Sequence, residues 1–478
     1  MKVVVHESPL VGTWYPGDTI ELRALLDEAF ERSRQRTGAF VRPGGIGFVV
    51  PHAAPMYSGT VAAAVYRHIR QSNASRVVVL GFSHRRQNQG IAIPQVDEFE
   101  TPLGEVMVDR AAAAELAGAP PFQSVPERVV CDHSVEIQLL FLRHILPDAT
   151  VVPLYVGPMS EKQRAEAARR LLGLVDSRTV LVASSDLTHY GQSFGYVPFP
   201  VDEDTPDKLK TLDERVLDCA GSLDAALFRT ELERTGATFC GYEPISLLLT
   251  LLSLRPGEEM FQETLDYQTS GDITDDYAHS VSYGALGYFP ADAYHLDAPS
   301  QKALLASARN ALDGYLRTGE LRMPMPDAGS ALAQRSRAFV SVYSDGELRG
   351  CVGRFERPET LARVVPELAI TAARDDPRFQ PIGAEEPFEL DIHLLTPKKR
   401  IREATQMIEN EHGAWLEAGP FRALLLPVVW RKYGWGRAEF LKALAHKAGV
   451  GESVYANSRT RLFVFRGQVI TEHAGATE

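Results

Sequence analysis

Three apolar stretches of this chain are each followed closely by a histidine or an aspartate. GFVVPHAAPMYSG carries His52, RVVVLGFSHRR carries His84, and TVLVASSDLTHYG carries Asp186 and His189. Two neutral imidazoles and one anionic group, with coordination positions left open, suit non-haem Fe(II) and some zinc and copper centres. His189 is the best placed candidate for a general acid or base. Asp186 is a candidate for the same pocket, although helix capping would also explain it.

A histidine and a glutamate are three residues apart at the start of an expected helix. They are His133 and Glu136, and Asp132 precedes them as a possible N-cap. Residues at this spacing lie on one face of a helix. We expect the pair to orient a ligand histidine by hydrogen bonding, while capping and surface pairing remain alternative explanations.

The elements that must position these residues are typical of an α/β sheet. Apolar segments that suit strands covered on both faces occur at 46–50, 77–80, 151–156 and 180–183. Helices are expected at 136–146 and 162–175, and final strands at 264–267 and 280–288. Ligands of open α/β sheets bind at the carboxyl ends of strands, so the polar tails should converge on one crevice. We predict a mostly parallel, doubly wound sheet.

The length of 478 residues indicates more than one domain, since single cores rarely exceed about 250 residues. The stretch PADAYHLDAPSQ lacks periodicity and suits a linker. We therefore expect a first domain at 1–292, a linker at 293–300 and a second domain at 301–478.

The second domain has the pattern of a smaller α+β domain with antiparallel strands. FVSVYSDGELRGCVG is typical of a hairpin that turns at Asp345-Gly346. Between 388 and 394, apolar residues alternate with Glu389, Asp391 and His393, which predicts a strand with one wet face.

Composition excludes several classes of function. A net charge of -12 gives phosphate backbones little to bind, so we expect no nucleic-acid partner. No apolar run approaches the roughly 18 residues that cross a bilayer, and the N-terminus does not resemble a signal peptide. The four cysteines are widely spaced and form no CxxC. We expect a cytoplasmic protein that does not bind membranes.

The first domain resembles the Memo family over about residues 5–290, through VGTWYPGD, PHAAPMYSG, GFSH, DHSVEIQLLFL, SSDLTHYG, FCGYEPI, LDYQTSGD and VSYGALGYF in order. Memo proteins resemble class III extradiol dioxygenases in fold, with a cysteine in place of the glutamate that holds Fe(II). The resemblance implies a metal triad of His52, His84 and Cys240, with Asp186 and His189 lining the pocket. Departures from the family motifs at Ala54 and Phe82 should leave the ligands in place and make the pocket larger and more apolar.

The second domain resembles the AMMECR1 family over about residues 300–470, through LRGCVG, AARDDPRF, ELDIHLLTP, LLLPVVW and GWGRAEFLKALAHKAGV. Its chemically suggestive residue is Cys351, whose thiol pKa Arg349 could lower. A nucleophile or conjugation site is one interpretation, and a small buried residue on a tight strand is the other.

Together these patterns favour a metal-dependent redox protein, dioxygenase-like, that acts on an unidentified small molecule or peptide. Fe(II) is the expected metal, with copper or zinc as alternatives. The resemblance implies that the two modules act with a radical-SAM partner. A non-catalytic module that binds a metal or a peptide is the rival hypothesis, and hydrolysis at a zinc site is a third.

Overall fold

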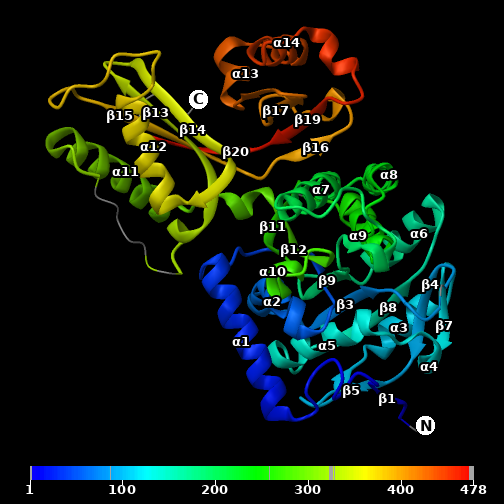
Figure 1. Cartoon of the computed structure of the whole chain (residues 1–478). Coiled ribbons are helices and arrows are strands. Elements are labelled where there is room, and N and C mark those ends of the chain that lie inside the picture. The colour runs from blue at the N-terminus through cyan, green and yellow to red at the C-terminus, as the bar shows by residue number, and fades with distance from the viewer. Residues whose placement is uncertain (1–2, 87, 258, 322–326, 328, 473–478) are drawn as a thin grey trace. The chain divides into compact units, whose positions relative to one another are not determined.

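The computed structural model describes residues 3–86, 88–257, 259–321, 327 and 329–472, and it forms two compact units (Figure 1). Unit 1 comprises Met1–Thr37 and Pro43–Pro290, and unit 2 comprises Gly38–Arg42 and Ala291–Glu478. The stretch 293–300, where the sequence suggested a linker, contains the end of the 3-10 helix η2 (Ala291–Tyr294) and the start of helix α11 (Ala298–Thr318).

Unit 1 is built on a nine-stranded sheet of order β10-β12-β2-β9-β3-β8-β4-β7, in which β11 also pairs with β12. Its strands are β2 (Gly47–Val50), β3 (Arg76–Gly81), β4 (Ile91–Gln95), β7 (Phe122–Pro126), β8 (Thr150–Val156), β9 (Thr179–Ser184), β10 (His189–Gly191), β11 (Met260–Thr269) and β12 (His279–Pro290). The central strands β2, β9, β3 and β8 are parallel, whereas β12 and β4 pair with them antiparallel. A small sheet joins β1 (Val5–Glu7), β5 (Glu98–Glu100) and β6 (Val106–Met107). The predicted, largely parallel α/β sheet is confirmed.

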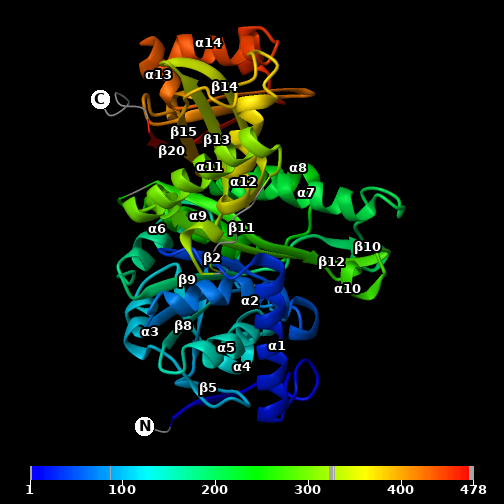
Figure 2. The same cartoon turned by 90° about the vertical axis from the view of Figure 1, so that its left-hand side faces the viewer.

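Helices cover both faces of this sheet, as Figures 1 and 2 show. They are α1 (Thr19–Thr37), α2 (Pro55–Gln71), α3 (Arg110–Ala117), α4 (Glu127–Val130), α5 (His133–Ile145), α6 (Glu161–Leu172), α7 (Thr205–Ala220), α8 (Ala225–Thr235), α9 (Tyr242–Leu254) and α10 (Gly271–Thr274). Helices α2 and α5 pack on one face, and α9 packs on the other together with α6. All residues of β2 and β9 are buried, which is why these strands are mostly apolar.

Unit 2 contains two four-stranded antiparallel sheets of order β14-β13-β15-β20 and β16-β19-β17-β18. The strands are β13 (Arg335–Ser344), β14 (Glu347–Thr360), β15 (Glu389–Leu395), β16 (Lys399–Ile401), β17 (Gly413–Ala418), β18 (Phe421–Leu425), β19 (Arg461–Phe465) and β20 (Gly467–Thr471). The helices beside α11 are α12 (Leu361–Arg374), α13 (Val428–Tyr433) and α14 (Arg437–Lys447). The expected smaller α+β domain with antiparallel strands is confirmed.

The hairpin of unit 2 turns where the sequence predicted, with positive φ at both Asp345 (51°) and Gly346 (79°). Positive φ at both central residues is the geometry of a type I′ turn. The expectation of a wet face on β15 is wrong, because Asp391 is 8% exposed and His393 6%. Alternation identifies which residues share a face of a strand, but it does not reveal that both faces are covered.

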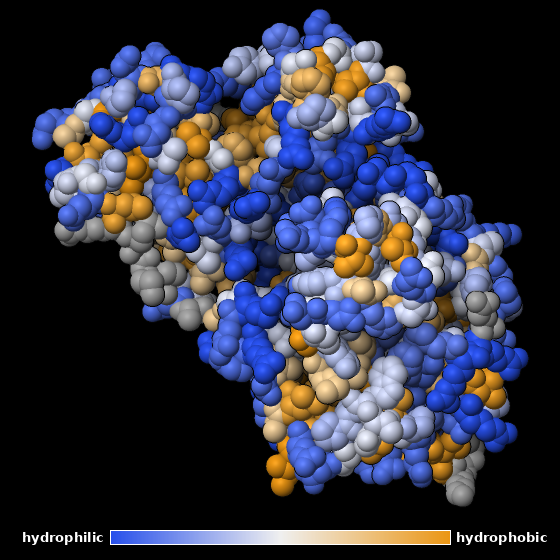
Figure 3. All heavy atoms as spheres, in the orientation of Figure 1, coloured by the Kyte–Doolittle hydropathy of each residue, from blue (hydrophilic) through white to orange (hydrophobic). Residues whose placement is uncertain are grey.

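On the face of the molecule drawn in Figure 3, hydrophobic residues lie in small groups among hydrophilic ones. Scattered apolar residues are ordinary on a protein surface. Among the described residues, no helix has both the length and the apolar character that crossing a membrane requires.

Candidate metal centre

The carboxyl ends of three neighbouring strands carry the candidate residues. Strands β2, β9 and β3 are parallel and adjacent, so their ends meet at one edge of the sheet. His52 follows β2, Asp186 follows β9 and His84 follows β3. The convergence expected from the sequence is therefore present in the structure.

His52 is the centre of the site and is 1% exposed. Its backbone N–H donates to Asp186 Oδ1 at 2.8 Å, and its Nδ1 lies 2.9 Å from Ser184 Oγ. Gln138 Nε2 donates to the same hydroxyl at 2.9 Å and holds it in place. With Nδ1 occupied, Nε2 is the nitrogen left for a metal, and burial lowers the pKa of His52, which keeps the ring neutral.

His84 is held by a carboxylate in the same way. Its Nδ1 lies 2.8 Å from Asp132 Oδ1, and its backbone N–H donates to Asp132 Oδ2 at 3.1 Å. A carboxylate on Nδ1 fixes the tautomer and raises the basicity of Nε2, as in many metal sites. Asp132 also caps α5 by accepting from Ser134 N at 3.1 Å. Burial raises the pKa of Asp132, but the combined effect of His84 and the neighbouring His133 is larger and opposite. The pKa of Asp132 therefore lies below its usual value.

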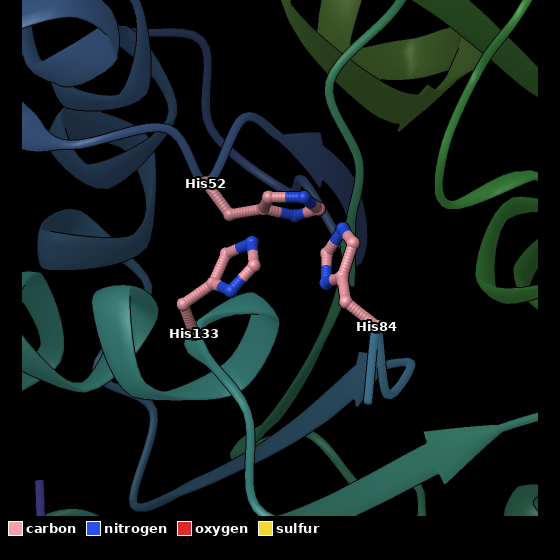
Figure 4. Close-up of side chains that lie close together, drawn as sticks. All are labelled: His52, His84 and His133. Carbon is pink, nitrogen blue, oxygen red and sulfur yellow. The ribbon is translucent and has the colours of Figure 1, made fainter. Parts of the chain in front are cut away.

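His133, the first residue of α5, points at the other two imidazoles (Figure 4). Its ring centroid lies 4.0 Å from that of His84 and 5.3 Å from that of His52. Trp14 lies against the opposite side of His133, with ring centroids 4.5 Å apart. Burial lowers the pKa of His133 to about 4, so this ring is also neutral at pH 7. The structure thus places His133 among the candidate ligands, whereas the sequence suggested an orienting role.

Cys240 lies on the other side of His52, with its Sγ 3.3 Å from His52 Nε2. Asp186 N–H donates to this sulfur at 3.2 Å. The glycine at position 241 lets the backbone after Cys240 lie close to the end of β9, because a Cβ at Gly241 would lie 2.3 Å from Ser184 O. Burial and the Asp186 carboxylate raise the pKa of the Cys240 thiol, and burial also raises the pKa of Asp186.

Two groups of ligand atoms therefore share His52: His52, His84 and His133 form one, and His52, Asp186 and Cys240 form the other. Within each group the atoms lie within 4.8 Å of one another. Neutral imidazoles fixed through Nδ1 fit a divalent transition metal, and a thiol with a raised pKa ionises when a cation binds it. The residues present fit a metal ion.

The remaining sequence candidates lie at different places. His189 is half-buried at the margin of the site, and its Nδ1 lies 3.0 Å from Leu187 O and 3.2 Å from Thr238 O. It is an electrostatic neighbour of both His52 and Asp186. The Glu136 carboxylate lies 3.2 Å from His6 Nε2 and accepts a hydrogen bond from the hydroxyl of Ser8.

In unit 2, Arg349 forms an ion pair with Glu386 and donates to Gln380 O. Cys351 is half-buried, and its backbone contacts Asp376 and Arg378. The arginine nearest to Cys351 in these contacts is therefore Arg378, which the sequence reasoning missed. Local sequence gave little indication of this contact, because Arg378 lies 27 residues from Cys351 along the chain.

Comparison with known proteins assigns both units. The family model described as Memo-like protein matches residues 7–287. The chain belongs to the Memo family. The AMMECR1 family model matches residues 305–470, so a Memo domain is fused to an AMMECR1 domain.

Relatives of the Memo domain occur widely. A MEMO1 family protein of Thermoplasma acidophilum is 30% identical over 279 residues, which are 58% of this chain and 96% of that protein. Protein MEMO1 of Xenopus laevis is 30% identical over 295 residues, 59% of this chain and 97% of the relative. Among solved structures compared with the whole chain, an uncharacterized protein of Pyrococcus horikoshii is 27% identical, with a TM-score of 0.35 and coverage of 36% of this chain and 92% of its own.

Proposed function

We propose that the Memo domain is a metal-dependent redox protein that holds Fe(II) through His52, which belongs to both ligand groups, with His84 from one group and Cys240 from the other. The observation that carries this proposal is the arrangement of the two imidazoles. Ser184 and Asp132 engage their Nδ1 atoms, while the Cys240 sulfur lies 3.3 Å from His52 Nε2. A bound iron would supply electron transfer to O2 or to an organic substrate, and two histidines with one anionic ligand leave positions open for it.

The chain's own groups would orient the substrate and move its proton. Asp132 sets the plane of the His84 ring, and Ser184 sets that of His52. His189 holds its Nδ1 against backbone carbonyls, which leaves Nε2 to give or take a proton. Phe82 lies 4.1 Å from the His84 ring between centroids and makes this part of the wall apolar. An apolar small molecule or peptide side chain fits such a wall.

A second ligand set needs a variant of its own, because the ring centroids of His133 and His84 lie 4.0 Å apart. Three imidazoles without a thiolate suit zinc or copper. Measuring the metal content of the Cys240→Ala and His133→Ala variants distinguishes the two ligand sets. Loss of iron in Cys240→Ala alone supports the proposal, and loss in His133→Ala alone would replace it with the three-histidine site.

The redox activity is tested with anaerobically prepared protein that carries stoichiometric Fe(II). We expect the wild-type protein to consume O2 when a catechol-type substrate is added. We expect the His189→Gln variant to retain iron but to consume no O2. Bound iron without turnover of any candidate would favour the rival function, a non-catalytic metal- or peptide-binding module. A radical-SAM protein is the partner we propose for the fused pair, and co-purification of the two tests it.

A further inference from the structure

Cys240 precedes a helix whose start is not fixed by a side-chain cap. Helix α9 begins two residues after it, and the N-cap residue Gly241 makes no side-chain bond to the first turn. By contrast, α5 and α8 each begin at an aspartate that accepts a hydrogen bond from the helix backbone. An N-cap of this kind normally holds the first turn of a helix in place. The position of Cys240 therefore depends on what else fixes the start of α9.

Glu243, in that first turn, is a buried carboxylate bound by two arginines. It is 4% exposed, and its Oε2 accepts from Arg164 Nη2 at 3.2 Å while its Oε1 accepts from Arg229 Nη1 at 2.7 Å. Arg164 lies on α6 and Arg229 on α8, and both helices pack against α9 (Figure 1). Hydrogen bonds between ionised groups are stronger than neutral ones. Glu243 thus connects the start of α9 to two other helices.

Arg164 depends on Glu243 for the compensation of its charge. Arg164 is 3% exposed, its Nη2 also donates to Met159 O at 3.2 Å, and its Nε has no hydrogen-bond partner among the residues that the structure describes. A buried charge that loses its counter-ion is strongly unfavourable, because the protein interior cannot replace the water that the charge has lost. Without the carboxylate, the helices around Arg164 would have to open to water, and the first turn of α9 would shift.

We propose that Glu243 is a positioning residue for Cys240, which keeps the sulfur within reach of a metal ion held by His52. The sulfur lies 3.3 Å from His52 Nε2, and only two residues separate Cys240 from Glu243. Metal ligands must be held to within roughly 0.5 Å, so a shifted first turn takes the sulfur out of range. The group of three histidines contains no residue of α9 and is unaffected by such a shift.

Glu243 thereby selects between the two ligand groups that share His52. With the carboxylate present, the thiol of Cys240 is available beside the imidazoles, and a soft thiolate ligand joins the site. Without it, the imidazoles alone remain. This inference rests on the proposed function, in which Cys240 is a ligand.

The first test loads the full-length chain with Co(II), a spectroscopic substitute for Fe(II). A sulfur-to-cobalt charge-transfer band reports the thiolate ligand, and Cys240→Ala defines the spectrum without it. The wild-type protein should show the band. Glu243→Gln should lose the band and retain Co(II) through the histidines, whereas a general loss of structure would lower the Co(II) content itself. An unchanged band in Glu243→Gln overturns the proposal.

Glu231→Gln is the matched control, because Glu231 is also a buried carboxylate bound by two arginines. It is 5% exposed and accepts from Arg215 Nε at 2.6 Å and from Arg234 Nη2 at 2.6 Å. It lies on α8 and belongs to neither ligand group. Glu231→Gln should keep the wild-type band, and equal loss of the band in both glutamate variants overturns the proposal.

Arg229→Gln gives a milder change that keeps the test decisive if Glu243→Gln does not fold. The Arg229 side chain is 30% exposed, so its loss removes one ion pair without leaving a buried cation unpaired. This variant should weaken the charge-transfer band. Arg215→Gln is its control, since Arg215 is 46% exposed and pairs with Glu231. Equal bands in these two arginine variants contradict the proposal.

A measurement on the metal-free chain separates this inference from the proposed function. Cys240 is half-buried, and iodoacetamide should alkylate it roughly tenfold faster in Glu243→Gln than in the wild type, as mass spectrometry of that residue will show. Glu231→Gln should react at the wild-type rate. This rate difference without a charge-transfer band in the wild type would support the positioning and refute Cys240 as a ligand. Equal alkylation rates in the wild type and Glu243→Gln would refute the positioning itself.

Discussion

Replacing Asp132 by asparagine tests whether the metal site depends on the carboxylate behind His84. Asp132 contacts His84 twice, at Nδ1 (2.8 Å) and at the backbone N–H (3.1 Å), and caps α5 at Ser134 N. Asparagine is as good an N-cap as aspartate, so the helix should lose little stability. The negative charge of the carboxylate beside the His84 imidazole is lost, however. Removing such an outer group typically costs roughly 10- to 100-fold in metal affinity, or about 1.4 to 2.7 kcal/mol.

The assay is competition between the protein and a chelator for Fe(II) under anaerobic conditions, with thermal unfolding of the metal-free protein measured in parallel. Asp224→Asn is the matched control, because Asp224 caps α8 by accepting from Leu227 N at 2.9 Å and belongs to neither ligand group. We expect weaker metal binding for Asp132→Asn alone. Equal affinity in Asp132→Asn and the wild-type chain would refute the role of Asp132.

Two predictions concern the stability of unit 2. The hydrogen bond from Arg378 holds the pKa of Asp376 well below its usual value of 3.8, so the stability that this carboxylate contributes is present above about pH 4 and is lost as the pH falls further. Urea unfolding should therefore show a gap between wild type and Asp376→Asn that narrows below pH 4, and a constant gap would contradict this. Gly350→Ala should destabilise by about 1 to 3 kcal/mol, since the new Cβ would overlap Ala372 O, whereas Gly314→Ala in the open part of α11 should stabilise by roughly 0.5 to 1 kcal/mol. Equal melting temperatures for the two glycine variants would show that the close approach at Ala372 is relieved without cost.

The strands that carry the site could be predicted because they are buried on both faces. Expected segments at 77–80 and 180–183 correspond to β3 (Arg76–Gly81) and β9 (Thr179–Ser184). Strand β4 (Ile91–Gln95), which lies between β8 and β7, was missed, since its IAIPQ sequence contains a proline that argues against a central strand. Its place beside β8 follows from tertiary pairing.

The candidate ligands at strand ends were predictable, but their supports were not. His52 and His84 follow apolar strands, a pattern that is local in the sequence. Asp132 reaches His84 across 48 residues, and Trp14 reaches His133 from the N-terminal segment. Such contacts depend on how α5 docks against the sheet, which no local pattern encodes. Cys240 was found only through family resemblance, because an isolated cysteine has no distinguishing spacing.

The most direct test of the central claim, that the histidines at the strand ends bind a metal, is elemental analysis after anaerobic loading with Fe(II) and removal of loosely bound metal. His52 belongs to both ligand groups, so His52→Ala should lose the iron whichever group holds it. His144→Ala is the control, since His144 lies on α5 but in neither group. Stoichiometric iron in the wild type and in His144→Ala, with none in His52→Ala, is the predicted result. Equal iron in His52→Ala and the wild type would contradict the account.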